Sequence, residues 1–344
     1  MSEQNISVDF TVDETEAGQR LDAWLVARID GVSRSQIGRA IEAGRVTRNG
    51  EPPAKAGVKV RADDQIHFEH EPVRSVLPIA QDLPLGVIYL DEWLAVVNKP
   101  PAMVVHPSAG HPDGTMVNAL LHHVGRLSEG SQQERPGIVH RLDKDTTGLL
   151  VVARDAVTHR ALSEALARRE VRRSYITVAL GRRMEGQGTI ETLYGRHPRE
   201  RLKMSGQVAV GKRACTHWRV LAQSQALVLL EVRLDTGRTH QIRVHLSEAG
   251  HPVVGDELYG RQPPRGGGGR LAFEHGAVRK MPRQALHAAV LAFKHPVTGE
   301  DCRFSAPLPD DMTRLIERVF EEEGSRVVDL VLRGGASDSA AGQS

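Results

Sequence analysis

Beyond residue 85, strand-like segments outnumber helical ones and rarely alternate with them, and this pattern restricts the fold more than any other feature. Helices are expected over Asp155–Arg169 and near 239–249, where Thr239 is the expected N-cap. The pattern favours an α+β domain with a mixed, mostly antiparallel sheet flanked by helices over a doubly wound sheet. The strand-like segments are 86–98, 137–141, 148–153, 173–180, 208–221, 226–235 and 285–294.

The chain's 344 residues leave room for about two domains, and composition suggests where they divide. Residues 1–17 hold five acids and no base, which predicts a flexible acidic tail. Residues 18–70 combine two short helical patterns with small strands, so we expect a small α/β unit there. A proline-containing linker is expected at 71–84, the large domain at 85–325, and a largely disordered tail at 326–344.

Charge is unevenly distributed along the chain. The net charge of +2 alone argues against a strongly basic nucleic-acid-binding protein. Residues 196–243, however, hold ten bases and three acids, and arginines far outnumber the eight lysines of the whole chain. The planar guanidinium of arginine suits phosphates and base edges, although GC-rich coding explains an arginine excess equally well.

Several protein classes are disfavoured. The sequence has no apolar run of membrane-spanning length, and its start lacks the pattern of a signal peptide, so we expect a cytoplasmic protein. The chain has only two cysteines, Cys215 and Cys302, which lie far apart in the sequence, and this count argues against a disulfide framework and a thiolate metal site. His-based zinc and phosphate-loop signatures are also missing, so the sixteen histidines are weak evidence for a metal site.

The densest group of reactive side chains lies in GIVHRLDKDTTGLLVVAR, residues 137–154. One interpretation is a simple hairpin in which Asp145 and Thr146 bond their own backbone. The other is a catalytic turn, because a carboxylate such as Asp143 stays ionised beside cations, as a nucleophile or electrostatic stabiliser requires. The residues alone leave both interpretations open and favour the hairpin.

A resemblance to a known family, carried by four motifs in the same order, decides between these two interpretations. HRLDKDTTG is preceded by VVNKPPAMVVHP at 96–107 and followed by RRSYITVALG at 172–181 and GRTHQIRVHL at 237–246. Together they resemble the RluA family of pseudouridine synthases, and most closely its RluD-type branch, which acts on large-subunit ribosomal RNA. Residues 18–68 resemble the alpha-L RNA-binding domain that this branch carries. The resemblance covers roughly residues 18–310.

The resemblance implies a role for individual residues. Asp143 matches the catalytic aspartate, Tyr175 the active-site tyrosine, and Arg243 the arginine that pairs with the aspartate. Arg141 matches the residue that fills the stack vacated by a flipped uridine, and His140 is expected to orient the same turn. The implied reaction isomerises uridine within an RNA chain and needs no cofactor or metal. It leaves open whether the aspartate attacks the uracil ring, attacks the anomeric carbon or removes a ribose proton.

Lys99 resembles part of a family motif, but we assign it no chemical step and consider a structural role at least as plausible.

We expect RNA affinity to come from basic side chains on the protein surface. Aromatic residues are only 4% of the chain, which disfavours binding of single-stranded RNA by stacking of its bases on aromatic rings. Recognition of RNA shape and backbone fits this composition better. A solvated helix face is the alternative interpretation for the N-terminal group. The expected contacts are Arg34, Arg39, Arg45 and Arg48 in the small domain, and Arg196, Arg199, Arg201 and Lys203 in the large one.

The sequence therefore predicts a monomeric enzyme that makes pseudouridine in large-subunit ribosomal RNA, within assembling subunits. One rival is an RNA chaperone that retains the fold without the activity, although the joint presence of Asp143, Tyr175 and Arg243 argues against it. A second rival is the same enzyme class acting on transfer RNA, which the N-terminal domain disfavours.

Overall fold

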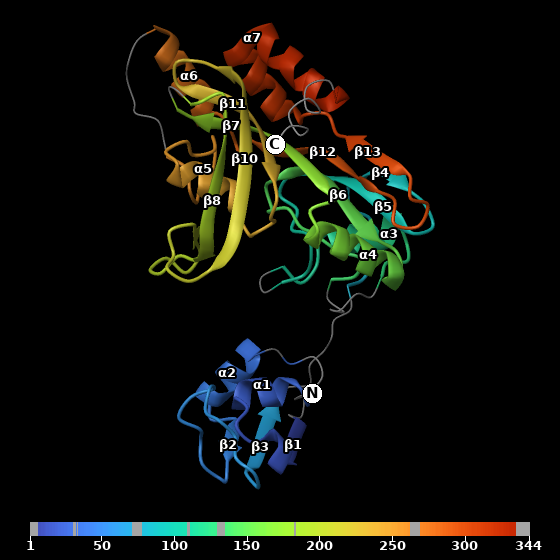
Figure 1. The fold of residues 1–344 in the computed structure, drawn as a ribbon, viewed down its shortest axis with the longest axis vertical. Coiled ribbons are helices and arrows are strands. Elements are labelled where there is room, and N and C mark those ends of the chain that lie inside the picture. The colour runs from blue at the N-terminus through green and yellow to red at the C-terminus, as the bar shows by residue number, and fades with distance from the viewer. Residues whose placement is uncertain are drawn as a thin grey trace. The chain divides into compact units, whose positions relative to one another are not determined.

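The structure is a computed structural model in which the chain forms two compact units, Met1–Leu77 and Pro78–Ser344 (Figure 1). It describes residues 6–334 except 30–31, 33, 71–77, 109–110, 129–134, 182–183 and 262–268. Each unit is described by itself below.

The first unit packs two short helices on a three-stranded antiparallel sheet of order β1-β3-β2. Its centre is Trp24, which is fully buried with Ile37 and Phe68. The indole N–H of Trp24 donates to Glu16 (3.0 Å), so the ring's polar atom has a partner inside the core. The elements are β1 (Ile6–Thr11), a 3₁₀ turn (Glu14–Glu16), α1 (Leu21–Val26), α2 (Arg34–Glu42), β2 (Val46–Arg48) and β3 (Gln65–His70).

The prediction of a flexible tail over 1–17 is wrong for its described part. Residues 6–11 form β1, which pairs along its length with β3. Val8, Phe10 and Val12 alternate toward the core, and the Phe10 ring meets Trp24 edge-on at 5.8 Å. Of the acids that suggested a tail, Asp9 lies between these positions, and Asp13, Glu14 and Glu16 follow the strand. Asp9 accepts a hydrogen bond from His67 on the outer face (2.8 Å).

The second unit is built on a ten-stranded sheet, and the predicted α+β class is confirmed. The strands run in the order β4-β5-β6-β12-β7-β11-β10-β8-β9, and β13 pairs with β12. Among the pairings described, β6–β12 is parallel and the others are antiparallel. The strands are β4 (Gly86–Leu90), β5 (Leu94–Lys99), β6 (Thr147–Ala153), β7 (Arg172–Leu180), β8 (Gln187–Arg196), β9 (Met204–Ser205), β10 (Lys212–Gln223), β11 (Leu227–Leu234), β12 (Leu286–Lys294) and β13 (Asp301–Ser305).

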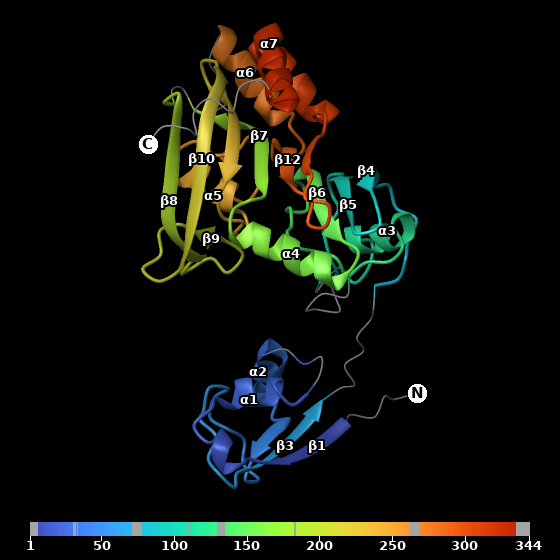
Figure 2. The same ribbon diagram turned by 45° about the vertical axis from the view of Figure 1, so that its right-hand side comes forward.

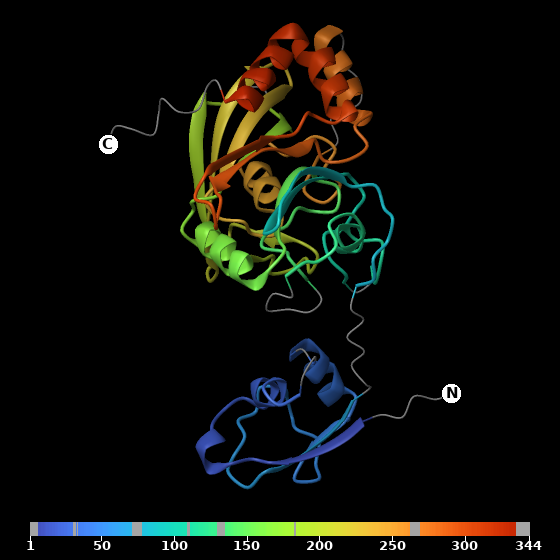
Figure 3. The same cartoon turned by 90° about the vertical axis from the view of Figure 1, so that its right-hand side faces the viewer.

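Helices cover both faces of this sheet. On β7, Ile176 and Val178 point to the face that carries α6 (Gly269–Arg279) and α7 (Asp310–Arg333). Tyr175 and Ala179 alternate to the opposite face, which packs against α3 (Met116–His123) and α5 (Gln241–Glu248). α4 (Ala156–Ala167) packs on the α7 side through Leu162. Figure 2 shows α6 beside α7, and Figure 3 shows strands between them and α5. No helix in the described ranges has the length and apolar character to cross a membrane.

One glycine allows the parallel contact between β6 and β12. Gly148 has φ +114°, and a Cβ there would lie 2.3 Å from the carbonyl oxygen of Ala288, its partner in the ladder. This approach leaves no room for a side chain, so position 148 requires glycine. With glycine there, β6 pairs with β12 directly after the turn that carries Asp143.

Three further expectations need correction. Residues 137–141 are not a strand but touch the sheet by one bridge, Ile138 to Val152. Of the expected linker, 71–77 lie outside the described residues, whereas 79–81 bond to the second unit through Asn118, which donates to the Ile79 carbonyl (2.8 Å). Residues 326–333 are not a tail but the last two turns of α7.

That end of α7 is helical because it has an apolar face. Val328 and Val331 are buried against the sheet. Arg303 on β13 donates to the Val331 carbonyl (3.0 Å), and Gly334 ends the helix in the left-handed conformation. Residues 335–344 lie outside the described part.

Candidate active site

The turn at 143–146 is held by residues from elsewhere in the chain. The Thr146 N–H donates to the Asp143 carbonyl (3.1 Å). The side chains of Asp145 and Thr146, which the hairpin interpretation bonded to their own backbone, have partners elsewhere in the described residues. The Asp145 carboxylate instead accepts the N–H of Ala102 (3.1 Å), and the Thr146 hydroxyl accepts from Gln284 (3.2 Å). These bonds fix the turn from the β5 and β12 sides.

Lys99 holds the same turn from beneath, which gives it the structural role considered above. It is fully buried, and its ammonium donates to the Lys144 carbonyl (2.8 Å) and to two carbonyls of its own loop. Burial lowers the pKa of Lys99 to about 7, although the charges of Asp145 and Asp143 oppose that shift.

Asp143 and Arg243 meet across 100 residues of sequence. Arg243 Nη1 donates to Asp143 Oδ2 at 2.9 Å, and both side chains are largely buried. The bidentate pair of Arg243, however, is with another residue, Asp256, through Nε–Oδ2 (2.6 Å) and Nη2–Oδ1 (2.9 Å). Burial alone would lower the pKa of Arg243, but the bonds and charges of Asp256 and Asp143 outweigh it and raise that pKa.

Sequence reasoning missed Asp256, which lies 13 residues after Arg243. Its carboxylate is fully buried and also accepts the backbone N–H groups of Leu258 (2.9 Å) and Tyr259 (3.0 Å). Arg243 is therefore clamped by Asp256 and presents one remaining N–H to Asp143.

The start of α5 differs from the prediction. The N-cap is His240, in the left-handed conformation at φ +60°, and not Thr239, whose carbonyl accepts the Tyr194 hydroxyl (2.6 Å). The next residue, Gln241, is buried and donates to the Cys215 carbonyl (3.0 Å) and the Thr216 hydroxyl (2.9 Å) of β10. These bonds set the position from which α5 presents Arg243.

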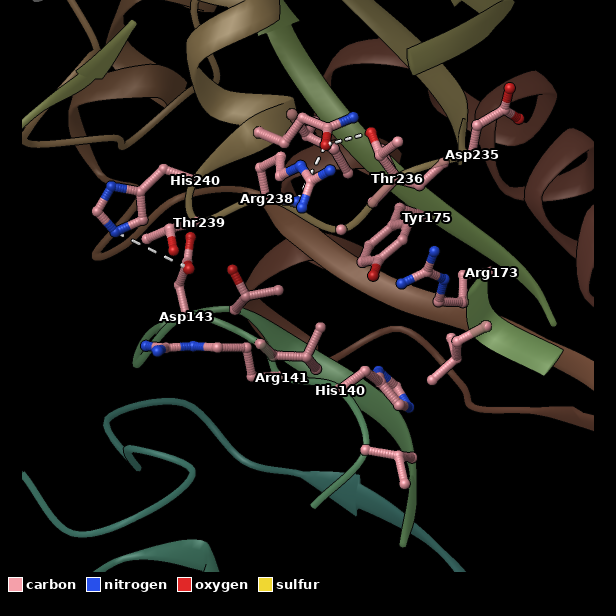
Figure 4. A pocket seen from close by; sticks show the side chains of 18 of the residues that line it. His140, Arg141, Asp143, Arg173, Tyr175, Asp235, Thr236, Arg238, Thr239 and His240 are labelled. Carbon is pink, nitrogen blue, oxygen red and sulfur yellow. Dashed lines mark hydrogen bonds and ion pairs between the residues drawn. The ribbon is translucent and has the colours of Figure 1, made fainter. Parts of the chain in front are cut away.

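Tyr175 lies on the opposite side of the same pocket, on β7 (Figure 4). Burial raises the pKa of its hydroxyl. Arg173, two residues earlier on the same face, was missed by sequence reasoning. Its Nε is buried with no hydrogen-bond partner in the described chain, and a Cβ at Gly237 would lie only 2.8 Å from its Nη1. The glycine of the GRTH motif is the signal that could have indicated this close approach.

The pocket has a volume of about 680 Å³, which is within the range of small-molecule sites. Asp143 and Tyr175 lie on its walls with apolar side chains such as Leu142 and Ile242. Its lining is rich in arginine, which gives it a strongly cationic border. The arginines are Arg135, Arg141, Arg169, Arg173, Arg213, Arg238 and Arg243.

The side chain of His140 is partly buried and hydrogen-bonded, whereas the side chain of Arg141 is exposed. His140 Nε2 accepts the N–H of Val151 on β6 (3.1 Å), so the ring is committed to holding its own segment against the sheet. Burial, together with the charge of Arg173, lowers the pKa of His140 to about 3. Arg141 is exposed and lies at the pocket beside Asp143 (Figure 4).

The predicted RNA-contact residues do not line this pocket. Arg34 and Arg39 are exposed on α2, whereas Arg48 pairs with the buried Asp64 (2.7 Å) and Arg45 is half-buried. The other group surrounds β9 on the second unit. There Arg196 donates to the Arg201 carbonyl (2.8 Å), Lys203 pairs with Glu200 (2.7 Å), and Arg199 is exposed.

The neutral state of His245 on α5 gives a testable pH dependence. It is buried between the hydroxyls of Thr192 (3.0 Å) and Thr216 (2.8 Å), and burial lowers its pKa to about 4. The unfolded chain binds a proton near pH 6.5, so this contribution to stability is present above that pH and is lost as pH falls toward 4. We expect wild type to lose about 2 kcal/mol more than His245→Gln between pH 7 and pH 5. Urea unfolding at both pH values measures this, and equal losses would contradict it.

Comparison with known proteins identifies the family of this chain. Residues 93–248 match the RNA pseudouridylate synthase family, and residues 19–66 match the S4 domain. The ribosomal large subunit pseudouridine synthase D of Escherichia coli O6:H1 is 43% identical over 327 residues, covering 94% of this chain and 98% of that protein. The chain belongs to the RNA pseudouridylate synthase family. The resemblance to the RluA family and its RluD-type branch is confirmed.

Other members of the RNA pseudouridylate synthase family are also similar to this chain. The synthase D of Vibrio parahaemolyticus is 42% identical over 93% of this chain and 96% of its own length. The solved structure of human RNA pseudouridylate synthase domain containing 4 is 27% identical with a TM-score of 0.51, covering 68% of this chain and 93% of its own. This chain is therefore an RNA pseudouridine synthase with an N-terminal S4 RNA-binding domain, and the pocket around Asp143 is its candidate active site.

Proposed function

We propose that this enzyme converts specific uridines of large-subunit ribosomal RNA to pseudouridine during ribosome maturation in the cytoplasm, acting as a monomer. The substrate is proposed from one observation: this chain matches relatives named for the large ribosomal subunit over nearly its whole length and theirs. The S4 domain supports an RNA substrate, as does the arginine border of the pocket.

We propose Asp143 as the catalytic carboxylate, with Oδ1 as the reacting atom. Oδ2 accepts the N–H of Arg243, whereas Oδ1 has no hydrogen bond in the described chain and lies 3.9 Å from His240 Nε2. Arg243 balances the negative charge and fixes the direction of the carboxylate. This assignment holds for attack on the base, attack on the ribose or removal of a ribose proton.

The isomerisation needs a detached base to be held and turned. The bond from the ribose to N1 breaks and a bond to C5 forms, while the C5 proton leaves and N1 gains one, so no oxidant or reductant is required. The ring of Tyr175, on the wall of the pocket, suits stacking on the free uracil, and its hydroxyl is the group that we propose to relay a proton. Arg141, exposed beside Asp143, is the side chain we propose to replace the flipped base in the RNA stack.

Mapping pseudouridines in ribosomal RNA from cells with and without this gene tests the proposal. We expect specific sites in large-subunit RNA to revert to uridine in the deletion strain and to return on complementation. Loss confined to transfer RNA would instead support the rival substrate, and an unchanged map would contradict both.

Removing the S4 unit should reduce activity on structured RNA. We expect deletion of residues 1–77 to lower kcat/KM on large-subunit ribosomal RNA on the order of 10-fold. The deleted unit carries exposed basic side chains, including Arg34 and Arg39, that would no longer contact RNA phosphates. The same protein on a short stem-loop that holds the target uridine is the control, and there we expect a smaller change. An unchanged kcat/KM on both substrates would show that the S4 unit has another role.

A further inference from the structure

A second group of reactive side chains lies at the edge of the pocket. Cys215 and His217 share one face of β10, and Asp235 follows β11, the neighbouring strand. Cys215 Sγ lies 3.6 Å from His217 Nε2, which lies 3.0 Å from Asp235 Oδ1. All three donor atoms lie within 4.8 Å of one another. None of the three has a part in the proposed reaction.

These separations fit a tetrahedral metal ion. Zinc bonds of about 2.3 Å to sulfur and about 2.0 Å to nitrogen or oxygen place S and N roughly 3.5 Å apart, and N and O roughly 3.3 Å apart. The observed distances of 3.6 Å and 3.0 Å differ from these by a few tenths of an ångström. Side-chain movement of that size is ordinary on metal binding.

The donors are also oriented. The Thr189 hydroxyl bonds His217 Nδ1 (2.9 Å), which leaves Nε2 directed at the cluster, as partners of ligand histidines generally do. The backbone of Cys215 is fixed by the Thr236 hydroxyl (3.0 Å) and by Gln241 at the start of α5 (3.0 Å). The side chain of His217 is partly exposed, which gives an ion a route in.

The local charges permit a divalent cation. Arg213 pairs with Glu191 through two 2.7 Å bonds. Arg233, opposite His217 in the ladder, shares Glu231 with Arg219, at 3.1 Å and 2.6 Å respectively. Arg169 contacts Asp235 at 3.5 Å from the outside. A thiolate and a carboxylate would balance the two charges of the ion, and Arg169 is free to move into solvent.

We propose that Cys215, His217 and Asp235 bind a thiophilic divalent cation, Zn²⁺ in the first instance, with water as the fourth ligand. The ion would tie β10 to the segment 235–240 that leads into α5. Because cysteine binds the ion as a thiolate, binding releases a proton and strengthens as pH rises.

Cobalt titration of the tag-free, full-length, chelator-treated protein tests this site. We expect one equivalent of Co²⁺ to give the visible absorption of tetrahedral coordination with a thiolate charge-transfer band, and stoichiometric Zn²⁺ to displace it. Cys215→Ser should abolish the charge-transfer band. Thr189→Val should weaken affinity roughly 10-fold. Cys302→Ser, which changes the other cysteine outside the cluster, is the matched control and should leave the spectrum unchanged.

His217→Gln provides a second ligand variant in case Cys215→Ser fails to fold, because the His217 side chain is partly exposed. Circular dichroism checks the fold of each variant. The proposal is overturned if wild type gives no tetrahedral cobalt spectrum. It is equally overturned if folded His217→Gln binds as tightly as wild type, or if Cys302→Ser removes the band.

Discussion

Asp143→Asn should lower pseudouridine formation by at least about 10³-fold and leave RNA affinity within a few-fold. The amide keeps the shape of the side chain and can still accept the N–H of Arg243, so the fold should be unchanged. It cannot supply the negative oxygen that each version of the chemistry needs. Single-turnover rates with the target stem-loop, together with gel-shift affinities, measure the two effects separately.

Asp145→Asn is the matched control for this prediction. It removes a carboxylate two residues away that accepts the N–H of Ala102 and contacts no part of the proposed chemistry. We expect at most about a 10-fold loss from it, through slight loosening of the turn. Turnover retained by Asp143→Asn, or an equal loss in both variants, would remove Asp143 from its catalytic role.

Arg243→Met should reduce both activity and stability, because Arg243 serves two carboxylates. Stability suffers because Asp256 is fully buried and would lose its bidentate partner. Leaving a buried charge unpaired costs roughly 3–5 kcal/mol. Thermal unfolding and single-turnover rates on the same preparation measure the two losses.

The double variant Arg243→Met/Asp256→Asn separates the two roles. Removing both charges should recover most of the lost stability, since the amide at 256 can still accept the N–H groups of Leu258 and Tyr259. The rate should remain at least about 10²-fold below wild type, because Asp143 still lacks its partner. Recovery of the rate together with stability would make Arg243 a structural ion pair only.

The predictable part of the site was the part that local motifs encode. The motif order indicated that Asp143, Tyr175 and Arg243 belong together, and the structure places all three on one pocket. Asp256 and Arg173 were missed because their positions depend on which strands are neighbours in the sheet and how α5 leaves it. Spacing along the chain does not carry that information.

Errors in the fold had a similar cause. The acids of residues 1–17 hid the alternation of Val8, Phe10 and Val12, which is a strand pattern. In the same way, a thiolate metal site was disfavoured because Cys215 has no ligand-type motif. Its neighbours His217 and Asp235 come from strand alternation and from an adjacent strand, and only the ladder brings Asp235 close.

The rigid support of the turn at 143–146 affects how substrates are chosen. Lys99, Ala102 and Gln284 hold this turn in place before any RNA arrives, so little ordering of the enzyme remains to be done on binding. The main conformational work then falls on the RNA, whose uridine must leave its stack. We therefore expect selectivity among accessible uridines to follow the local melting of the RNA, with weakly paired loop uridines reacting before those in stable stems.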